Sequence, residues 1–168
     1  MKTIFSFLFF VVVVSVQAQP IDELILNKRF DKALHRIEAA LQEEASGDLY
    51  FKQALVYKEL SKPLLAAKSL EKALLYEPKN SNYLAELGEN YSVLGNLYQS
   101  VECFRQASMF APENIGLKAR LGRAYLSIDD FKRAFTTFAS VRQVDSTNIY
   151  FNKQFAFAAF KTEQQNLS

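Results

Sequence analysis

The single histidine, the single cysteine and one pair of adjacent aspartates are the residues of this sequence best suited to catalysis or metal binding. A lone His35 rules out a metal site built on two histidines, and its place in an expected helix favours the protein surface. Cys103 has no partner for an internal disulfide, and its helical setting favours a small, inward-packed apolar role. Asp129 and Asp130 can form a catalytic pair, but aspartate at this place also caps a helix beginning near Phe131. Because glycine-rich phosphate loops and nucleophile elbows are also missing from the sequence, we expect no catalytic residue, metal ligand or cofactor.

Four charged residues form two pairs separated by one constant interval. Glu86 precedes Arg120 by the same number of positions as Glu89 precedes Arg123. If a structural unit recurs at this interval, each glutamate lies beside its arginine, and each exposed ion pair stabilises the fold by about 0–1 kcal/mol. Alternatively, Arg120, Arg123 and Lys153 hold an acidic peptide or a C-terminal carboxylate. The sequence leaves both interpretations open.

The same interval recurs through most of the chain. Small residues, tyrosine, a large apolar residue, proline and asparagine each return in this register. The matching sets are Ala54/Gly88/Gly122, Tyr57/Tyr91/Tyr125, Leu70/Phe104/Phe138, Pro78/Pro112 and Asn80/Asn114/Asn148. Apolar residues at helical spacing make each unit two amphipathic helices, with small residues where one helix approaches the other closely. Proline after the second helix stops it, because proline cannot continue the hydrogen-bond ladder.

These motifs resemble the tetratricopeptide repeat, a helix-turn-helix unit of about 34 residues. The unit at residues 81–114 is the closest match, through Leu84, Leu87, Gly88, Tyr91, Ser100, Phe104, Ala107 and Pro112. The resemblance implies an all-α fold, a right-handed α-solenoid of stacked repeats with a closing C-terminal helix. The expected parts are an atypical first unit at 19–46, full units at 47–80, 81–114 and 115–148, and a closing helix with a short tail at 149–168.

The resemblance also implies a concave groove, lined by the first helix of each unit, that holds peptides or helices of other proteins. The candidate partner-binding residues in this register are Phe51, Leu55, Glu86, Glu89, Arg120, Arg123, Tyr150, Lys153, Phe157 and Phe160. Some members of the family bind carboxylates with a lysine–asparagine clamp. This sequence does not reproduce it, because Phe51, Leu55, Ala85 and Glu89 stand at the corresponding positions.

The closing helix, expected over residues 149–162, is apolar around much of its circumference, although a terminal helix needs a polar outer face for solubility. Phe151 and Phe155 can cover the preceding unit, which leaves three aromatic side chains without an evident internal partner: Tyr150, Phe157 and Phe160. Either these rings fold back as ordinary cap packing, or they form an exposed patch that docks a partner or a second copy of the chain.

Residues 1–18 have the layout of a secretory signal peptide. One cation, Lys2, precedes an apolar run from residue 4 to residue 16, and Ala18 offers a cleavage site. The run has 13 residues, whereas a membrane span takes about 20, so a cleaved signal is favoured and a retained N-terminal anchor is the alternative. Cleavage would leave 19 basic against 18 acidic residues, a balance that gives no general attraction to nucleic acid or anionic lipid. We therefore expect an exported protein, periplasmic or secreted, that meets a membrane only if this segment is retained.

Together these features predict a non-catalytic scaffold that binds protein or peptide partners through its groove. The alternative is a self-associating structural or accessory subunit of an envelope or membrane complex, joined through its final helix.

Overall fold

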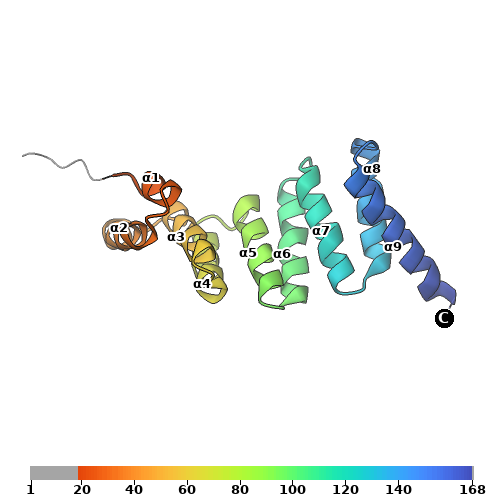
Figure 1. Ribbon diagram of the computed structural model, residues 1–168, viewed down its shortest axis with the longest axis horizontal. Helices are drawn as coiled ribbons and strands as arrows, with labels where there is room; N and C mark the ends of the chain where they lie inside the picture. Colours follow the sequence, from red (N-terminus) through yellow and green to blue (C-terminus); the bar gives the residue numbers. More distant parts are fainter. Residues whose placement is uncertain (1–18, 168) are drawn as a thin grey trace, which may run out of the picture.

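The computed structural model describes residues 19–167, which fold into helices joined by short turns (Figure 1). The predicted signal peptide, residues 1–18, lies outside the described residues, so its cleavage stays a prediction. Within the described part there are nine helices and no strand, which confirms the predicted all-α repeat fold. The helices are α1 (Ile21–Leu26), α2 (Phe30–Glu43), α3 (Gly47–Glu59), α4 (Pro63–Tyr76), α5 (Ser81–Val93), α6 (Leu97–Phe110), α7 (Ile115–Ser127), α8 (Phe131–Val144) and α9 (Ile149–Leu167). None of these nine is long and apolar enough to cross a membrane.

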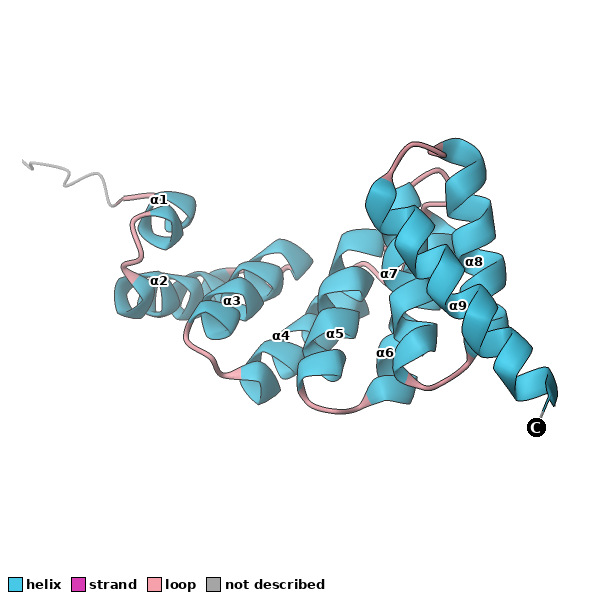
Figure 2. Cartoon of the chain, turned by 45° about the vertical axis from the view of Figure 1, so that its right-hand side comes forward, coloured by secondary structure: helices cyan, strands magenta, loops and turns pink. Residues whose placement is uncertain are grey.

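The helices follow one another in a row, with α1 at one end and α9 at the other (Figures 1 and 2). Each helix packs against the helices before and after it in the sequence, and α7 also contacts α9. Such nearest-neighbour packing is the organising rule of helical repeat proteins, in which each unit is stabilised by the units beside it.

Asparagine caps three of the helices, at equivalent positions of successive repeats. The Oδ1 atom of Asn80 accepts hydrogen bonds from two backbone N–H groups in the first turn of α5, at 3.0 and 3.2 Å. Asn114 caps α7 with one such bond of 3.1 Å, and Asn148 caps α9 with two, at 3.1 and 3.3 Å. Asp130 caps α8, as predicted, with Oδ1 3.0 Å from a backbone nitrogen of its first turn. Because the first N–H groups of a helix have no partner within it, these caps fix where the helices begin.

The turns after α3, α5 and α7 share one backbone geometry. In each turn, the N–H group five residues after the recurring tyrosine donates to the tyrosine carbonyl, at 2.8 Å for Tyr57 and Tyr91 and 3.0 Å for Tyr125. The fourth residue after each tyrosine has a positive φ: Ser61 (55°), Gly95 (77°) and Asp129 (57°). The three tyrosines therefore occupy equivalent positions in the backbone, as the repeat interval predicts.

Small residues on the first helix of a pair allow the second helix to approach closely. Gly88 on α5 lies against the ring of Phe104 on α6, so near that an added Cβ would come within 3.1 Å of it. Gly122 on α7 and Phe138 on α8 repeat the arrangement, with a corresponding distance of 2.8 Å. The helix axes can therefore approach in the way that the recurring small residues predict.

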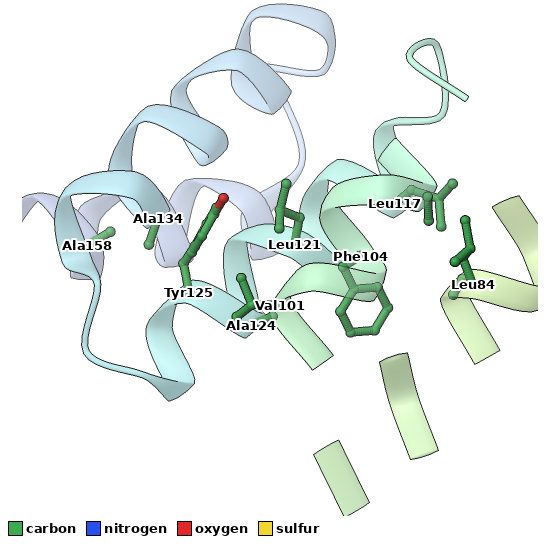
Figure 3. Packing of buried hydrophobic residues seen from close by; sticks show 11 residues of the cluster. Leu84, Val101, Phe104, Leu117, Leu121, Ala124, Tyr125, Ala134 and Ala158 are labelled. Atoms are coloured by element: carbon green, nitrogen blue, oxygen red, sulfur yellow. The ribbon is translucent and has the colours of Figure 1, made fainter. Parts of the chain in front are cut away.

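Buried apolar side chains form a core along the row of helices. Its largest cluster runs from Leu84 on α5 to Ala158 on α9 (Figure 3). A second cluster joins α3 to α6, and a third holds α1 and α2 against α3. Leu74 packs against both the first and the second cluster, so the core continues from α3 to α9. Cys103 belongs to the second cluster and is buried, which confirms its predicted inward packing.

The last helix is longer than predicted. α9 continues to Leu167 instead of ending near Thr162. Its sequence after Thr162 contains neither glycine nor proline, so nothing in this stretch stops the helix.

Candidate partner-binding groove

A hollow of about 500 Å³ opens across the first helices of neighbouring pairs. Its walls come from α3 and the turn after it, from the start of α4, from α5 and from α7. Six of the eight residues around it are charged or polar, and two are apolar. The lining residues are Lys58, Ser61, Pro63, Glu86, Glu89, Asn90, Val93 and Arg120.

Two smaller hollows adjoin the first, with volumes of about 270 and 130 Å³. Glu86 and Arg120 also line the 270 Å³ hollow, together with Phe51. Glu89 and Arg120 also line the 130 Å³ hollow, together with Arg123. Because Arg120 lines all three, we treat the hollows as one surface that runs from α3 over α5 to α7, and we call it the groove. Its smallest hollow also includes Ser100 and Phe104 of α6.

Two glutamates of α5 meet cations inside the groove. Oε1 of Glu89 lies 3.5 Å from Nη2 of Arg123 and 3.7 Å from Nε of Arg120. Glu86 accepts a hydrogen bond from Nζ of Lys58 on α3. The predicted pair Glu89–Arg123 is therefore confirmed, and the predicted pair Glu86–Arg120 is wrong. Lys58 reaches Glu86 from the preceding helix pair, and Arg120 extends to the glutamate about one helical turn further along α5.

The two arginines of the groove keep unused hydrogen-bonding capacity. Their side chains are 39% exposed at Arg120 and 50% exposed at Arg123. Their contacts with Glu89 are longer than the 2.7–3.2 Å of ordinary hydrogen bonds. Since each guanidinium carries five N–H donors, both can bind an incoming anion, and such an anion can compete with Glu89 for them.

Asn90 and Val93 give the largest hollow a polar and an apolar part. Asn90 is almost fully buried, and its Nδ2 donates a 3.0 Å hydrogen bond to the backbone oxygen of Glu86. Val93 is 74% exposed and lines the same hollow as Pro63. A ligand crossing this hollow therefore meets both a charged and an apolar wall.

Sequence reasoning missed Lys58, Asn90, Pro63 and Val93 as groove residues. Lys58 carried a usable signal, because it follows Leu55 by three residues, and residues three apart share one face of a helix. The others carried none, because an isolated valine, proline or asparagine is common in any helical protein.

The two residues predicted from α3 have different surroundings. Phe51 lines the 270 Å³ hollow, and its ring stacks on Tyr83 with 4.7 Å between the ring centroids. Its position is therefore fixed by α5 before any ligand binds. Leu55 is half-buried and lies outside the lining of the three hollows.

The four residues predicted from the closing helix lie on α9, outside the lining of the three hollows: Tyr150, Lys153, Phe157 and Phe160. Phe157 packs edge to face on Phe131 of α8, with 6.3 Å between centroids, yet stays 45% exposed. Phe160 is 56% exposed. Phe155 folds back on Phe135, with 4.9 Å between centroids, as cap packing predicts. The structure thus places five of the predicted site residues in the groove and four on a separate surface of α9, whereas Leu55 belongs to neither.

The histidine, the cysteine and the aspartate pair considered for catalysis belong to three different parts of the fold. His35 is exposed on α2, and Cys103 is buried between helices, where burial raises the pKa of its thiol to about 12. Asp129 and Asp130 belong to the turn and cap before α8. Across residues 19–167, no group of three or more histidine, cysteine or acidic side chains is arranged to hold a metal ion.

One repeat of this chain matches a known protein family, and a longer stretch is similar to a known protein. Residues 47–80, which contain α3, α4 and the turn after them, match the family model described as Tetratricopeptide repeat. The BBSome complex member BBS4 of Bos taurus is 27% identical over 111 residues, which make up 66% of this chain and 21% of that protein. The matched part of the chain therefore spans about a fifth of the length of this relative.

Solved structures share the fold over most of the chain. The crystal structure of MamA has a TM-score of 0.73 at 15% identity, covering 91% of this chain and 100% of that one. The first TPR of Spaghetti (RPAP3), bound to the HSP90 peptide SRMEEVD, has a TM-score of 0.63 at 14% identity, covering 73% and 94%. These likenesses concern the fold, and with the family match at 47–80 they support a tetratricopeptide-repeat protein.

Proposed function

We propose that this chain is an exported, non-catalytic scaffold whose groove binds a segment of another protein in the periplasm or outside the cell. The observation that carries the proposal is the continuity of the groove, because Arg120 lines three adjoining hollows between α3 and α7. A segment that crosses these helices can contact all three hollows at once.

The chemistry of the groove favours an extended acidic segment. Arg120 and Arg123 are partly exposed and make only long contacts with Glu89, so a carboxylate of the ligand can take the place of that side chain. Pro63 and Val93 offer an apolar wall for a neighbouring side chain of the same ligand. The Spaghetti structure, with its acidic peptide, supports this class of ligand for the fold. Binding here would not use the lysine–asparagine clamp, since this sequence lacks it.

The proposed export rests on the sequence of residues 1–18, with its single cation, apolar run and small residue at the end. Determining the N-terminus of the protein from its native host tests it. A chain that begins at Gln19 supports cleavage, whereas a chain that keeps the apolar run supports a membrane-tethered accessory subunit instead.

Site-directed crosslinking tests the groove. A photo-crosslinking residue replaces Asn82, which lines the 270 Å³ hollow, and in a control protein it replaces Leu75, which is exposed on α4. We expect a partner to be captured through position 82 in the native envelope fraction and not through position 75.

Charge reversal then assigns that capture to the arginines. The variant Arg120→Glu/Arg123→Glu is expected to lose the captured partner. The matched control Lys68→Glu/Lys132→Glu makes the same change in net charge at exposed lysines of α4 and α8, and it should keep the partner. Identical sets of captured proteins from both variants would remove the arginines from the proposed site.

A further inference from the structure

The outer face of α9 carries a regular stripe of six side chains. They follow one another at intervals of four, three, four, three and four residues, the spacing that keeps side chains on one face of a helix. All six are exposed in the described chain, so no other helix of the row covers them. The members of this outer stripe are Ile149, Lys153, Ala156, Phe160, Glu163 and Leu167.

The stripe includes a position that other first helices use for helix packing. Ala156 lies one repeat interval after Gly122, and Gly122 receives the ring of Phe138 from the helix that follows it. In α9 the equivalent small residue is exposed, because α9 is the last helix of the described row (Figure 2). Ala158, two residues on, faces the opposite way and is fully buried in the core cluster shown in Figure 3. The outer stripe therefore presents a helix-packing surface on which no helix of residues 19–167 lies.

The stripe is complementary to itself when read in the reverse direction. If two α9 helices cross antiparallel at the level of Ala158, Ile149 meets Leu167 of the second copy. In the same arrangement, Lys153 meets Glu163 of the second copy, and Ala156 meets the ring of Phe160. Aliphatic side chains meet each other, opposite charges meet, and a small residue receives a large one. A parallel arrangement would instead place Lys153 against itself and Glu163 against itself.

We propose that two copies of this chain pair through their α9 helices, antiparallel and related by a two-fold axis at the level of Ala158. Each contact then occurs twice, as in any isologous interface. The 19 residues of α9 span roughly 28 Å, so the two helices overlap along their whole length. Phe157 and Tyr150, which are 45% and 43% exposed, flank the outer stripe and add apolar surface beside it.

The other outer helix in the described part of the chain, α2, does not offer a matching surface for head-to-tail stacking. The exposed side chains of α2 include charged and polar groups along its length: Asp31, Lys32, His35 and Glu38. A face of this kind does not complement the apolar side chains of the outer stripe, whereas a second copy of α9 does. Closed pairs, and not filaments, are the expected product.

Sedimentation velocity of the purified chain, over roughly 1 to 200 µM, tests the pairing. A single helix pair makes a smaller interface than the ~1,200–2,000 Å² of stable complexes, so we expect a dimer that dissociates on dilution. A monomer at every concentration would overturn the proposal. The variant Arg120→Glu/Arg123→Glu should dimerise like the natural chain, which separates this test from that of the groove.

Charge exchange tests the antiparallel register. Lys153→Glu or Glu163→Lys alone brings like charges together at two symmetric places, and each is expected to raise the dimer dissociation constant roughly tenfold. The double variant K153E/E163K restores opposite charges and should return the constant to that of the natural chain. Single variants that dimerise normally, or a double variant that stays as weak as the singles, would contradict the register.

Truncation of an aromatic ring tests the packing. Phe160→Ser should weaken the dimer at least roughly tenfold, whereas Leu75→Ser, which shortens an exposed side chain of α4, should leave it unchanged. Because both side chains are exposed, neither substitution should change the helix content, and circular dichroism of each variant checks this. Equal dimerisation of the two variants would place the contact on another surface.

Discussion

Gly122 on α7 and Phe138 on α8 are in such close contact that a Cβ built on the glycine would lie 2.8 Å from two ring carbons of the phenylalanine. Gly88 and Phe104 make the same contact one repeat earlier, with 3.1 Å for the equivalent distance. The close packing of the second helix on the first therefore leaves little room for a side chain at either glycine. There is less room at Gly122 than at Gly88.

Gly122→Ala should destabilise the protein, although alanine is the better helix former by about 1 kcal/mol. The added methyl group must displace a fully buried ring, and overpacking of this kind costs roughly 1–3 kcal/mol. Gly88→Ala should cost less, because its ring lies further away. Urea unfolding of the three proteins measures the difference, and a Gly122→Ala protein as stable as the natural one would contradict the packing argument.

Phe138→Leu should offset part of the stability lost through Gly122→Ala, because the repeat at residues 47–80 combines alanine with leucine at the two equivalent positions. Ala54 and Leu70 stand there, and both are fully buried. We therefore expect Gly122→Ala/Phe138→Leu to be more stable than the sum of the two single changes predicts. The coupling free energy from a double-mutant cycle of unfolding measurements checks this, and additive effects would show that the ring and the methyl group do not compete for space.

The turns after α3 and α5 differ in the residue that adopts a positive φ. Ser61 has φ of 55° and Gly95 has φ of 77° at equivalent positions. A residue with a side chain is strained in this region, whereas glycine is not. Ser61→Gly should therefore raise the free energy of unfolding by about 0.5–1 kcal/mol, and Gly95→Ser should lower it by about 1 kcal/mol. Since nothing lies within 4 Å of a Cβ at Gly95, a loss there measures the backbone alone. Thermal unfolding measures both variants. Unfolding temperatures that change in the same direction for the two substitutions would contradict backbone strain at this position of the turn.

Cys103 should be protected from thiol reagents while the protein is folded. Its side chain is only 8% exposed, and burial raises its pKa to about 12 from the ordinary value near 8.5. At pH 8 the reactive thiolate is then rarer by about three orders of magnitude than in an unfolded chain. A raised pKa favours the neutral thiol in the folded protein, so this group adds to stability below about pH 8.5 and loses that contribution as the pH rises toward 12. Reaction with a chromogenic disulfide, with and without urea, measures the protection, and fast labelling of the folded chain would contradict the burial of the side chain.

Much of the fold follows from the sequence because a fixed interval constrains backbone geometry. The recurring asparagines become helix caps, the recurring tyrosines take equivalent places before the turns, and small residues face large ones. None of these outcomes depends on how a long side chain bends. The end of α9 was missed for a related reason, since a helix without a glycine or proline gives no sequence signal of where it stops.

The groove was harder to predict because it depends on flexible charged side chains. The repeat interval shows that α5 and α7 present equivalent positions, but it does not show in which direction an arginine extends. Arg120 extends to Glu89, whereas Glu86 meets Lys58 from another helix. Long side chains have many rotamers of similar energy, so these partners are decided by local packing that periodicity does not contain.

Glu89 is the side chain that an acidic ligand must displace in the proposed groove, so its charge should limit binding. It contacts both Arg120 and Arg123, and Glu89→Gln removes the negative charge without changing the shape of the side chain. Because each of these ion pairs is exposed and long, the free energy of unfolding should fall by less than about 1 kcal/mol. The affinity for an acidic probe, the peptide SRMEEVD, should instead rise about threefold to tenfold as both guanidinium groups become free.

Glu38→Gln is the matched control, because it makes the same change in net charge on the exposed face of α2, and it should leave the affinity unaltered. Fluorescence anisotropy with the labelled peptide measures all three proteins. If Glu89→Gln binds no more tightly than Glu38→Gln, the arginines are not the part of the groove that receives a carboxylate.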